Sequence, residues 1–381
     1  MTAPLMTVPE KSETERPIAA PHANMPALDE SAQKLSFFEF WPQWLFYTPV
    51  ILWWLWLSLR YGGPALPTAA NPGFPNGGFV GESKAQVFSR FGDRAKAALA
   101  PFICFCADHQ AKDQSLSVMA KARASGLDYP LVAKPDMGCR GAGVQVVRND
   151  RDLDRYIASF PDGALIILQK LVDQPGEVGL FYVRSPSQKQ GRLFSMTLKY
   201  FPTIIGNGRD HLERLIMDDP RAGQLPHLYL KRNAARLDEI IPKGEPVRLA
   251  FAGSHSKGAI FRDGRPYITE ALTQAIDALA RDIDGFYIGR FDVRFNDFKA
   301  LQEGRDFTII EVNGAGGEAT HIWDSRMTLK KAYGDLFEQF SMLFAIGRDN
   351  RRRGAPPINL LEFYRAWRHE ARLVRGYPPT D

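Results

Sequence analysis

Cysteine is scarce in this chain, and its scarcity limits both the compartment and the metal chemistry. The 381 residues contain only Cys104, Cys106 and Cys139. Three thiols make no disulfide framework, and no second Cys/His pair stands at the spacing of a zinc site. The sequence therefore fits a reducing compartment.

Several functional signatures are missing as well. The chain has no Ser-His-Asp order, no thiol-nucleophile signature and no repeat period. Its net charge of +5 comes from scattered Lys and Arg and from a cluster at Arg348 and residues 351–353. No nucleic-acid-binding motif accompanies that cluster, so a solvated basic face is expected and nucleic acid is not expected as a partner.

Long hydrophobic runs are absent with one exception, residues 37–60, which we interpret as an apolar membrane segment. Only Glu39 is charged before Arg60, and the run just reaches the length that spans a bilayer. Lys and Arg predominate after it, which would place the rest of the chain in the cytoplasm. Pro42, Pro49 and the marginal length suit a helix lying in the membrane interface, and burial within the protein is a third possibility.

The composition around this run suggests separate units. Residues 1–36 mix Pro, Ala, Glu, Ser and Thr without apolar periodicity, which predicts a disordered tail. Residues 61–81 are rich in Gly and Pro, which predicts a linker. The remaining 300 residues, in a chain that is 45% hydrophobic, are enough to bury a sizeable core.

Two apolar strands carry the strongest chemical signal. In residues 287–296 the alternation of strand side chains puts Arg290, Asp292 and Arg294 on one face. In residues 307–317 the same alternation puts Glu311 and Asn313 together, just before Gly314. Carboxylate and amide oxygens suit Mg²⁺, with Mn²⁺ as an alternative, completed by water and substrate phosphates. The plainer interpretation is two half-buried strands with surface ion pairs.

A glycine-rich loop follows another apolar strand. The strand ends at Lys134, and the loop runs from Gly138 through Arg140 and Gly141 to Gly143, with β-rich sequence after it. A Walker A loop or a dinucleotide fingerprint would need a helix there, so both are disfavoured. What remains is either a glycine hairpin closing over phosphates, with Lys134 adding charge, or simply a tight hairpin.

These motifs resemble the ATP-grasp superfamily, as in D-alanine:D-alanine ligases, cyanophycin synthetases and ribosomal-protein glutamate ligases. The similarity runs from about Leu131 to Asn313. It implies an α+β fold of two subdomains that grip ATP. It also implies that Asp292, Glu311 and Asn313 hold Mg²⁺, and that Lys134 and Arg290 are catalytic through contacts with the phosphates and the transferred phosphoryl group.

The resemblance extends to further binding positions. Gln169, Lys170 and Leu171 match the hinge that carries adenine, and Glu177 matches the acid that holds the ribose. Lys199, on the partner strand of a hairpin, is expected to enter the phosphate region. On the substrate side we expect His255 and the three glycines after the metal strand, because their unhindered backbone can approach a bound group; these glycines are Gly314, Gly316 and Gly317.

The resulting prediction is a Mg-dependent, ADP-forming ligase on the cytoplasmic side of a membrane. It joins a carboxylate and an amine, neither identified, through an acyl phosphate. Residues 129–345 form its ATP-grasp domain, residues 82–128 a reduced preceding region, and residues 346–381 a basic helical extension. Two alternatives stay open, a membrane-associated ATP-binding module without turnover and an ATP-grasp kinase. The sequence indicates no oligomeric state.

Overall fold

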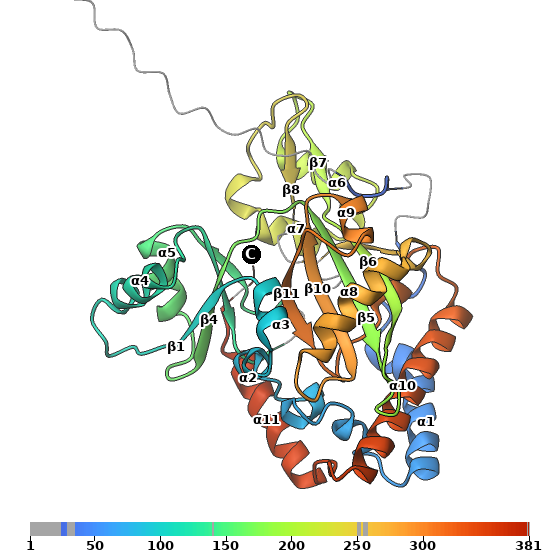
Figure 1. The fold of residues 1–381 in the computed structure, drawn as a ribbon. Coiled ribbons are helices and arrows are strands. Elements are labelled where there is room, and N and C mark those ends of the chain that lie inside the picture. The colour runs from blue at the N-terminus through green and yellow to red at the C-terminus, as the bar shows by residue number, and fades with distance from the viewer. Residues whose placement is uncertain are drawn as a thin grey trace, which may run out of the picture.

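The computed structural model describes residues 24–28, 35–138, 141–249, 253, 258–378 and 380. Two antiparallel sheets stand side by side in it, each covered by helices on the face turned away from the other (Figure 1). The predicted α+β class, with two subdomains, agrees with this mixed architecture of antiparallel sheets.

The smaller sheet has the strand order β1-β4-β2-β3. Helices α4 and α5 pack on one of its faces, where Met119, Leu153 and Tyr156 meet Ile166 and Leu168 in a buried core. Asn149 caps α5 by accepting a hydrogen bond from the Asp152 N–H. The elements are β1 (Phe102–Cys106), α4 (Gln114–Ala124), β2 (Leu131–Pro135), β3 (Gln145–Val147), α5 (Asp150–Ala158) and β4 (Leu165–Lys170).

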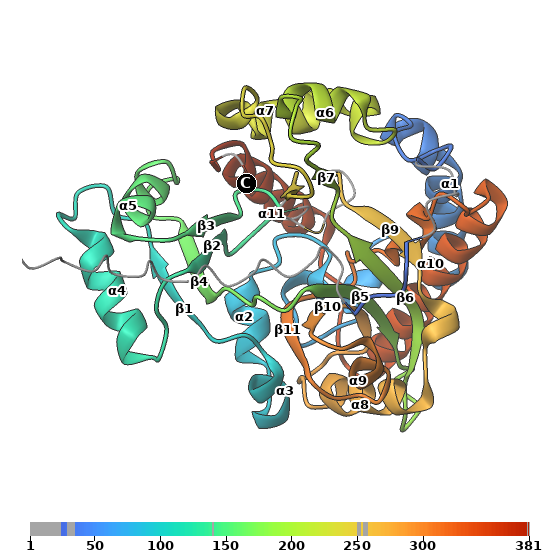
Figure 2. The ribbon, with the colours of Figure 1, turned by 90° about the horizontal axis from the view of Figure 1, so that it is seen from above.

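The larger sheet has the order β11-β10-β5-β6-β9. Helix α8 buries Leu272 and Ile276 against it, and α9 lies beside α8, so this face is closed (Figure 2). Its polar face is turned toward the smaller sheet. The elements are β5 (Gly176–Val183), β6 (Arg192–Tyr200), β9 (Ile260–Asp263), α8 (Glu270–Arg281), β10 (Ile288–Phe295), α9 (Phe298–Gln302) and β11 (Phe307–Asn313).

Between β6 and β9 the chain makes an excursion above the larger sheet, with a core of its own around Leu212, Ile216 and Tyr229. It consists of β7 (Thr203–Ile205), α6 (Leu212–Asp218), α7 (Pro226–Arg232) and β8 (Pro246–Arg248). Two short helices, α2 (Lys84–Ser89) and α3 (Asp93–Ala98), precede β1 and lie between the two sheets (Figure 1). After them the Ala100 N–H donates to the Ile309 carbonyl at 2.8 Å, which joins the start of β1 to β11.

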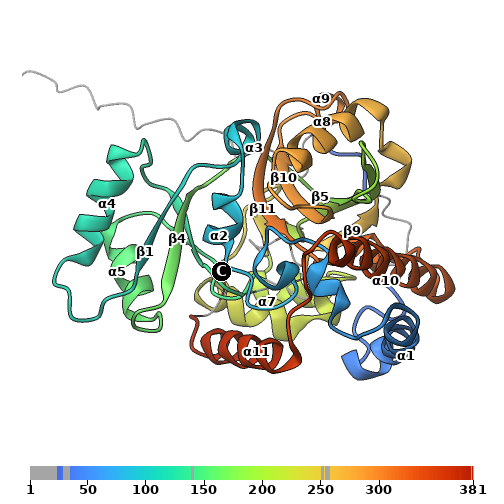
Figure 3. The same cartoon turned by 60° about the horizontal axis from the view of Figure 1, so that its bottom comes forward.

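The predicted membrane segment forms helix α1 (Gln43–Tyr61), which lies along the long helix α10 (Leu329–Arg352) (Figure 3). Trp53 donates to the Phe337 carbonyl at 3.1 Å, and the Trp54 ring meets Phe344 edge-on. In the described part of the chain, no helix combines the length and the apolar character that crossing a membrane requires. One face of α1 is therefore buried within the protein, as the third possibility anticipated.

The predicted linker, residues 61–81, is packed on the core instead of separating two units. Two 3-10 turns, η1 (Leu66–Ala69) and η2 (Pro75–Gly78), flank the fully buried Asn71. The Asn71 oxygen accepts from the N–H groups of Tyr287 and Ile288, and its amide donates to the Ile288 carbonyl at 2.8 Å. The glycines and prolines that suggested a linker shape a compact segment under β10.

The predicted tail also touches the core where the structure describes it. Tyr200 donates to the Pro26 carbonyl at 2.7 Å, and Met25 and Leu28 pack against the larger sheet's core. At the other end of the chain, α11 (Leu360–Arg375) has no fully buried residue and runs along the side of the molecule that also carries α1 (Figure 3).

Candidate active site

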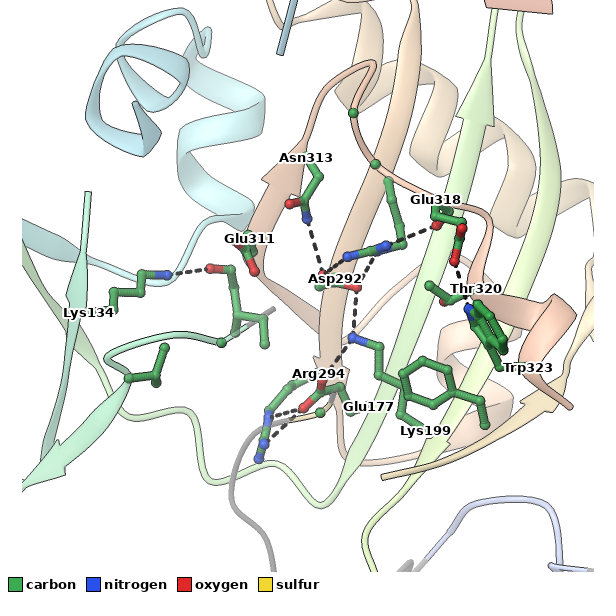
Figure 4. Close-up of a pocket in the computed structure, with 18 of the residues that line it drawn as sticks. Lys134, Glu177, Lys199, Asp292, Arg294, Glu311, Asn313, Glu318, Thr320 and Trp323 are labelled. Atoms are coloured by element: carbon green, nitrogen blue, oxygen red, sulfur yellow. Dashed lines mark hydrogen bonds and ion pairs between the residues drawn. The ribbon is translucent and has the colours of Figure 1, made fainter. Parts of the chain in front are cut away.

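A cavity of about 730 Å³ lies between the two sheets. Strands β2 and β4 supply one wall, and β5, β6, β10 and β11 supply the other (Figure 4). Five cations and three carboxylates from these strands line it, and they are Lys134, Lys170, Lys199, Arg290, Arg294, Glu177, Asp292 and Glu311. The structure thus brings together residues that lie far apart in the sequence.

Asp292 is the centre of this network. One of its oxygens accepts from Lys199 Nζ at 2.8 Å and Arg290 Nε at 3.0 Å. The other accepts from a second nitrogen of Arg290 at 3.1 Å and from the Asn313 amide at 3.3 Å. Burial favours the neutral acid, but the two cations outweigh it and hold the pKa of Asp292 at about 2. Asp292 is therefore an anion at neutral pH.

Glu177 belongs to the same network. One carboxylate oxygen lies 3.1 Å from Lys199 Nζ, and the other lies 3.0 Å from Arg294. Burial opposes its ionisation, yet both cations lower its pKa, and Glu177 in turn helps to raise that of Lys199. The ribose role predicted for Glu177 does not match this placement, because both oxygens are engaged and the side chain is 3% exposed. It orients the cations.

Lys134 reaches across from the smaller sheet. Its ammonium donates to the Gln169 side-chain oxygen at 2.7 Å and to the Ile310 carbonyl of β11 at 3.0 Å. Burial is the main reason that its pKa falls to about 8, with Glu311 and Asp292 restoring part of the loss. Gln169, Lys170 and Leu171, which were predicted for the adenine hinge, all line the cavity.

The glycine loop has the backbone that its sequence predicted. Gly138, Gly141 and Gly143 have φ of 135°, 70° and 68°, in the region that favours glycine. Lys84 donates to the Gly138 carbonyl at 2.9 Å. The C-terminal end of the chain also contacts the loop, where Thr380 donates to the Gly141 carbonyl at 2.6 Å. Cys139, Arg140 and His255 lie outside the described residues.

Glu311 and Asn313 stand where strand pairing predicted them. In the β10–β11 ladder Asp292 is opposite Glu311, and Arg290 is opposite Asn313, so all four share one face. Glu311 is partly open to the cavity, with Lys84 Nζ 3.5 Å away. Among the described residues no group of three or more His, Cys, Asp and Glu stands close enough to hold a metal by itself. Two carboxylates and an amide nevertheless fit Mg²⁺ completed by water and phosphate.

The glycines after β11 serve a purpose that the sequence did not reveal. The N–H groups of Ala315 and Gly316 donate to the carbonyls of Gly77 and Gly78 at 3.0 and 2.7 Å. A Cβ on Gly314 would lie 2.7 Å from the Gly78 Cα, so the two backbones touch without side chains between them. This contact explains the glycines of both segments, and it places Gly314 against protein backbone. Gly316 and Gly317 line the cavity, so their role toward a substrate stays a prediction.

Two further acids, Glu82 and Glu318, lie at or near the cavity without having been predicted from the sequence. Glu82 accepts a hydrogen bond from the N–H of Gly314, the residue after β11, at 3.0 Å, and in the sequence it stands next to the segment interpreted as a linker. Glu318 accepts from Tyr47 at 2.6 Å and from Trp323 at 2.7 Å, while its carbonyl accepts from Arg290 at 2.9 Å. Glu318 follows the glycine run directly, and that position was the one available signal.

Glu82 gives a prediction about stability and pH. Burial raises its pKa to about 8, although Lys84 and the Gly314 N–H offset part of the effect. Between the ordinary pKa of 4.5 and about 8, the folded protein keeps a proton that the unfolded chain has lost, so stability falls as pH rises. We expect Glu82→Gln, whose side chain can still accept a hydrogen bond from Gly314, to have a melting temperature that changes little between pH 5 and 8. The wild type should lose on the order of a few kcal/mol across this range.

The control for this experiment is Glu303→Gln, an exposed glutamate beside α9. The melting temperature of this variant should change with pH as that of the wild type does. Lys134, with a pKa of about 8, stays charged over most of the range between pH 5 and 8. Parallel curves for Glu82→Gln and the wild type would show that Glu82 is not protonated in the folded state.

Comparison with known proteins gives matches among solved structures alone. No family model and no curated protein matches the chain. It is similar to a D-alanine–D-alanine ligase from Bacillus anthracis, with 12% identity and a TM-score of 0.39 over 71% of this chain and 68% of that one. A bifunctional glutathione synthetase from Pasteurella multocida shows 17% identity and a TM-score of 0.34 over 67% of this chain and 36% of that one.

A third match is N5-carboxyaminoimidazole ribonucleotide synthetase, with 15% identity and a TM-score of 0.35 over 65% of this chain and 52% of that one. The chain spans about a third of the glutathione synthetase's length. Because all three TM-scores lie below 0.5, the similarity does not define the reaction, and the evidence for the reaction comes from the site itself.

Proposed function

We propose that this protein is an ATP-dependent carboxylate–amine ligase that forms an amide through an acyl phosphate. The supporting observation is the set of five cations and three carboxylates that these strands place around one cavity between two sheets, beside a glycine loop. Such a set attracts a polyphosphate and retains anionic oxygens for a divalent cation. No protein nucleophile is needed for this chemistry.

The walls of the cavity offer separate places for the parts of ATP. Val132 and Val144 of the smaller sheet, Leu171 of the hinge and Ile310 of β11 line it with apolar side chains suited to an adenine ring. The phosphates would then point toward Lys134, Lys199 and Arg290. Gly141 of the glycine loop lies at the same wall, where its backbone can approach phosphate oxygens.

The oxygens of Asp292, Glu311 and Asn313 would hold Mg²⁺, which neutralises phosphate charge and orients the terminal phosphoryl group when it is bound. Lys199 and Arg290 already compensate Asp292 in the structure. They are therefore placed to shift toward phosphate oxygens when a cation takes over that carboxylate.

The proposed reaction has two steps. A substrate carboxylate oxygen attacks the γ-phosphorus, and the bond from that phosphorus to the ADP oxygen breaks. An amine then attacks the carbonyl carbon of the acyl phosphate, loses a proton and displaces inorganic phosphate. Arg290, with its guanidinium fixed by Asp292 and the Glu318 carbonyl, stabilises the charge that grows on the transferred group.

The test is a screen of carboxylate and amine pairs for ADP release by the purified protein with ATP and Mg²⁺. A ligase releases ADP substantially only when both substrates are present. Release with one hydroxyl or carboxylate substrate alone would instead identify a kinase, and ATP binding without release under any pair would identify a binding module. Asp292→Asn, purified in parallel, reveals any contaminating ATPase, because the proposal requires that variant to be inactive.

A further inference from the structure

Helix α1 presents an apolar face to solvent. Trp44 is 72% exposed, Leu52 62% and Leu59 86%, while Phe46, Val50 and Leu57 on the opposite face are buried. The exposed side chains recur every three or four residues and so form one stripe, made of Trp44, Leu45, Ile51, Leu52, Leu55, Trp56 and Leu59. A continuous apolar surface of this kind marks an interaction site.

Helix α11 carries a second apolar surface. Leu360, Leu361, Tyr364 and Trp367 are between 49% and 63% exposed. Leu360, Tyr364 and Trp367 are spaced by four and three residues, which puts them on one face of the helix. The two helices lie on the same side of the molecule, away from α8 and α9, in both Figure 2 and Figure 3.

Arginines surround these apolar residues. Residues 348–375 contain eight arginines against three acids, and Arg351, Arg352 and Arg353 are exposed at the C-terminal end of α10. Arg60 ends the α1 stripe with its guanidinium 5.3 Å from the Trp56 ring centroid. A second copy of this chain would bring the same positive charge, which disfavours it as the occupant. An anionic surface is complementary.

We propose that α1 and α11 form a docking face for the surface of an anionic lipid bilayer, with both helices lying in the plane of the interface. Leucine side chains supply the hydrophobic contact, tryptophan and tyrosine suit the headgroup boundary, and arginines supply the attraction to anionic lipid. The binding strength of an interfacial helix increases with its buried apolar area and with its attraction to anionic lipid, and this face supplies both. The proposal is independent of the ligase reaction.

The test is co-sedimentation of the full-length protein with vesicles. We expect it to bind vesicles of equimolar phosphatidylcholine and phosphatidylglycerol, and to bind phosphatidylcholine alone more weakly. The combined variant Leu52→Ser, Leu55→Ser and Leu59→Ser should lower the partition coefficient by roughly tenfold or more, since each leucine contributes apolar burial. Arg352→Gln with Arg353→Gln should reduce the preference for anionic vesicles, about fivefold for each arginine.

The matched control is Leu116→Ser on α4, a leucine that is 55% exposed but lies on the smaller-sheet lobe. It should bind vesicles like the wild type. All the substituted side chains are exposed, so unchanged melting temperatures are expected and would establish that the variants fold. Wild-type binding by the triple leucine variant overturns the proposal, as does complete release of the protein by salt alone.

Two other results would also overturn it. The first is an absence of binding to the mixed vesicles. The second is a concentration-dependent dimer in analytical ultracentrifugation that the leucine substitutions abolish, because the stripe would then be an interface between copies of the chain. Neither outcome bears on ADP release, so failure here and failure of the ligase proposal remain distinguishable.

Discussion

Glu311→Gln is expected to abolish Mg-dependent turnover while leaving the protein folded. Glu311 is the partly exposed carboxylate opposite Asp292, and Lys84 Nζ lies 3.5 Å from it. Glutamine keeps the shape of the side chain but removes the charge that a divalent cation requires. Several kcal/mol of transition-state stabilisation depend on that cation, so ADP release should fall by roughly a thousandfold.

The measurement is the initial rate of ADP release against Mg²⁺ concentration, with the substrate pair that the screen identifies. Glu303→Gln serves again as the control, since it changes the net charge equally at an exposed position. A near-normal rate with an unchanged Mg²⁺ requirement would remove Glu311 from the proposed metal site.

Arg290→Lys is expected to lower kcat far more than it raises the KM for ATP. The guanidinium makes two contacts to Asp292 and a third to the Glu318 carbonyl, all between 2.9 and 3.1 Å. Lysine keeps the charge but lacks the planar fork, so it cannot make the three contacts at once. Loss of a donor aimed at developing charge typically costs about a hundredfold to a thousandfold in kcat.

Steady-state kinetics with ATP as the varied substrate separate the two effects. Arg305→Lys, at an exposed position after α9, is the matched control and should behave as the wild type. If Arg290→Lys loses ATP affinity and keeps its turnover, Arg290 is a ground-state ligand of the nucleotide and its proposed role in phosphoryl transfer is wrong.

Alternation along two strands was enough to predict which polar side chains lie together in the candidate site. The register of β10 and β11 places Arg290, Asp292, Glu311 and Asn313 on one face, because side-chain direction in a strand follows from position alone. The positive φ values in the Gly138–Gly143 loop likewise follow from residue type. Both features are local, so a single sequence contains the information.

Contacts between distant segments could not be predicted in this way. Residues 61–81 have the composition of a linker, yet their glycines make room for the backbone after β11. Within the same segment, the Asn71 side chain forms a hydrogen bond with β10. The hydropathy of α1 suggested a membrane span because composition does not reveal that α10 offers Phe337 and Phe344 as partners. In each case the deciding neighbour lies more than 200 residues along the chain.

The pairing of α1 with α10 has a consequence for synthesis of the chain. Helix α1 ends at Tyr61, and its partner begins at Leu329, so the ribosome completes the first long before the second. At typical elongation rates the interval lasts on the order of tens of seconds. Throughout it the residues that later face α10, including Phe46, Val50 and Leu57, stay without their native cover. During that interval both apolar faces of α1 are exposed to chaperones. In the finished protein only the face turned away from α10 stays exposed.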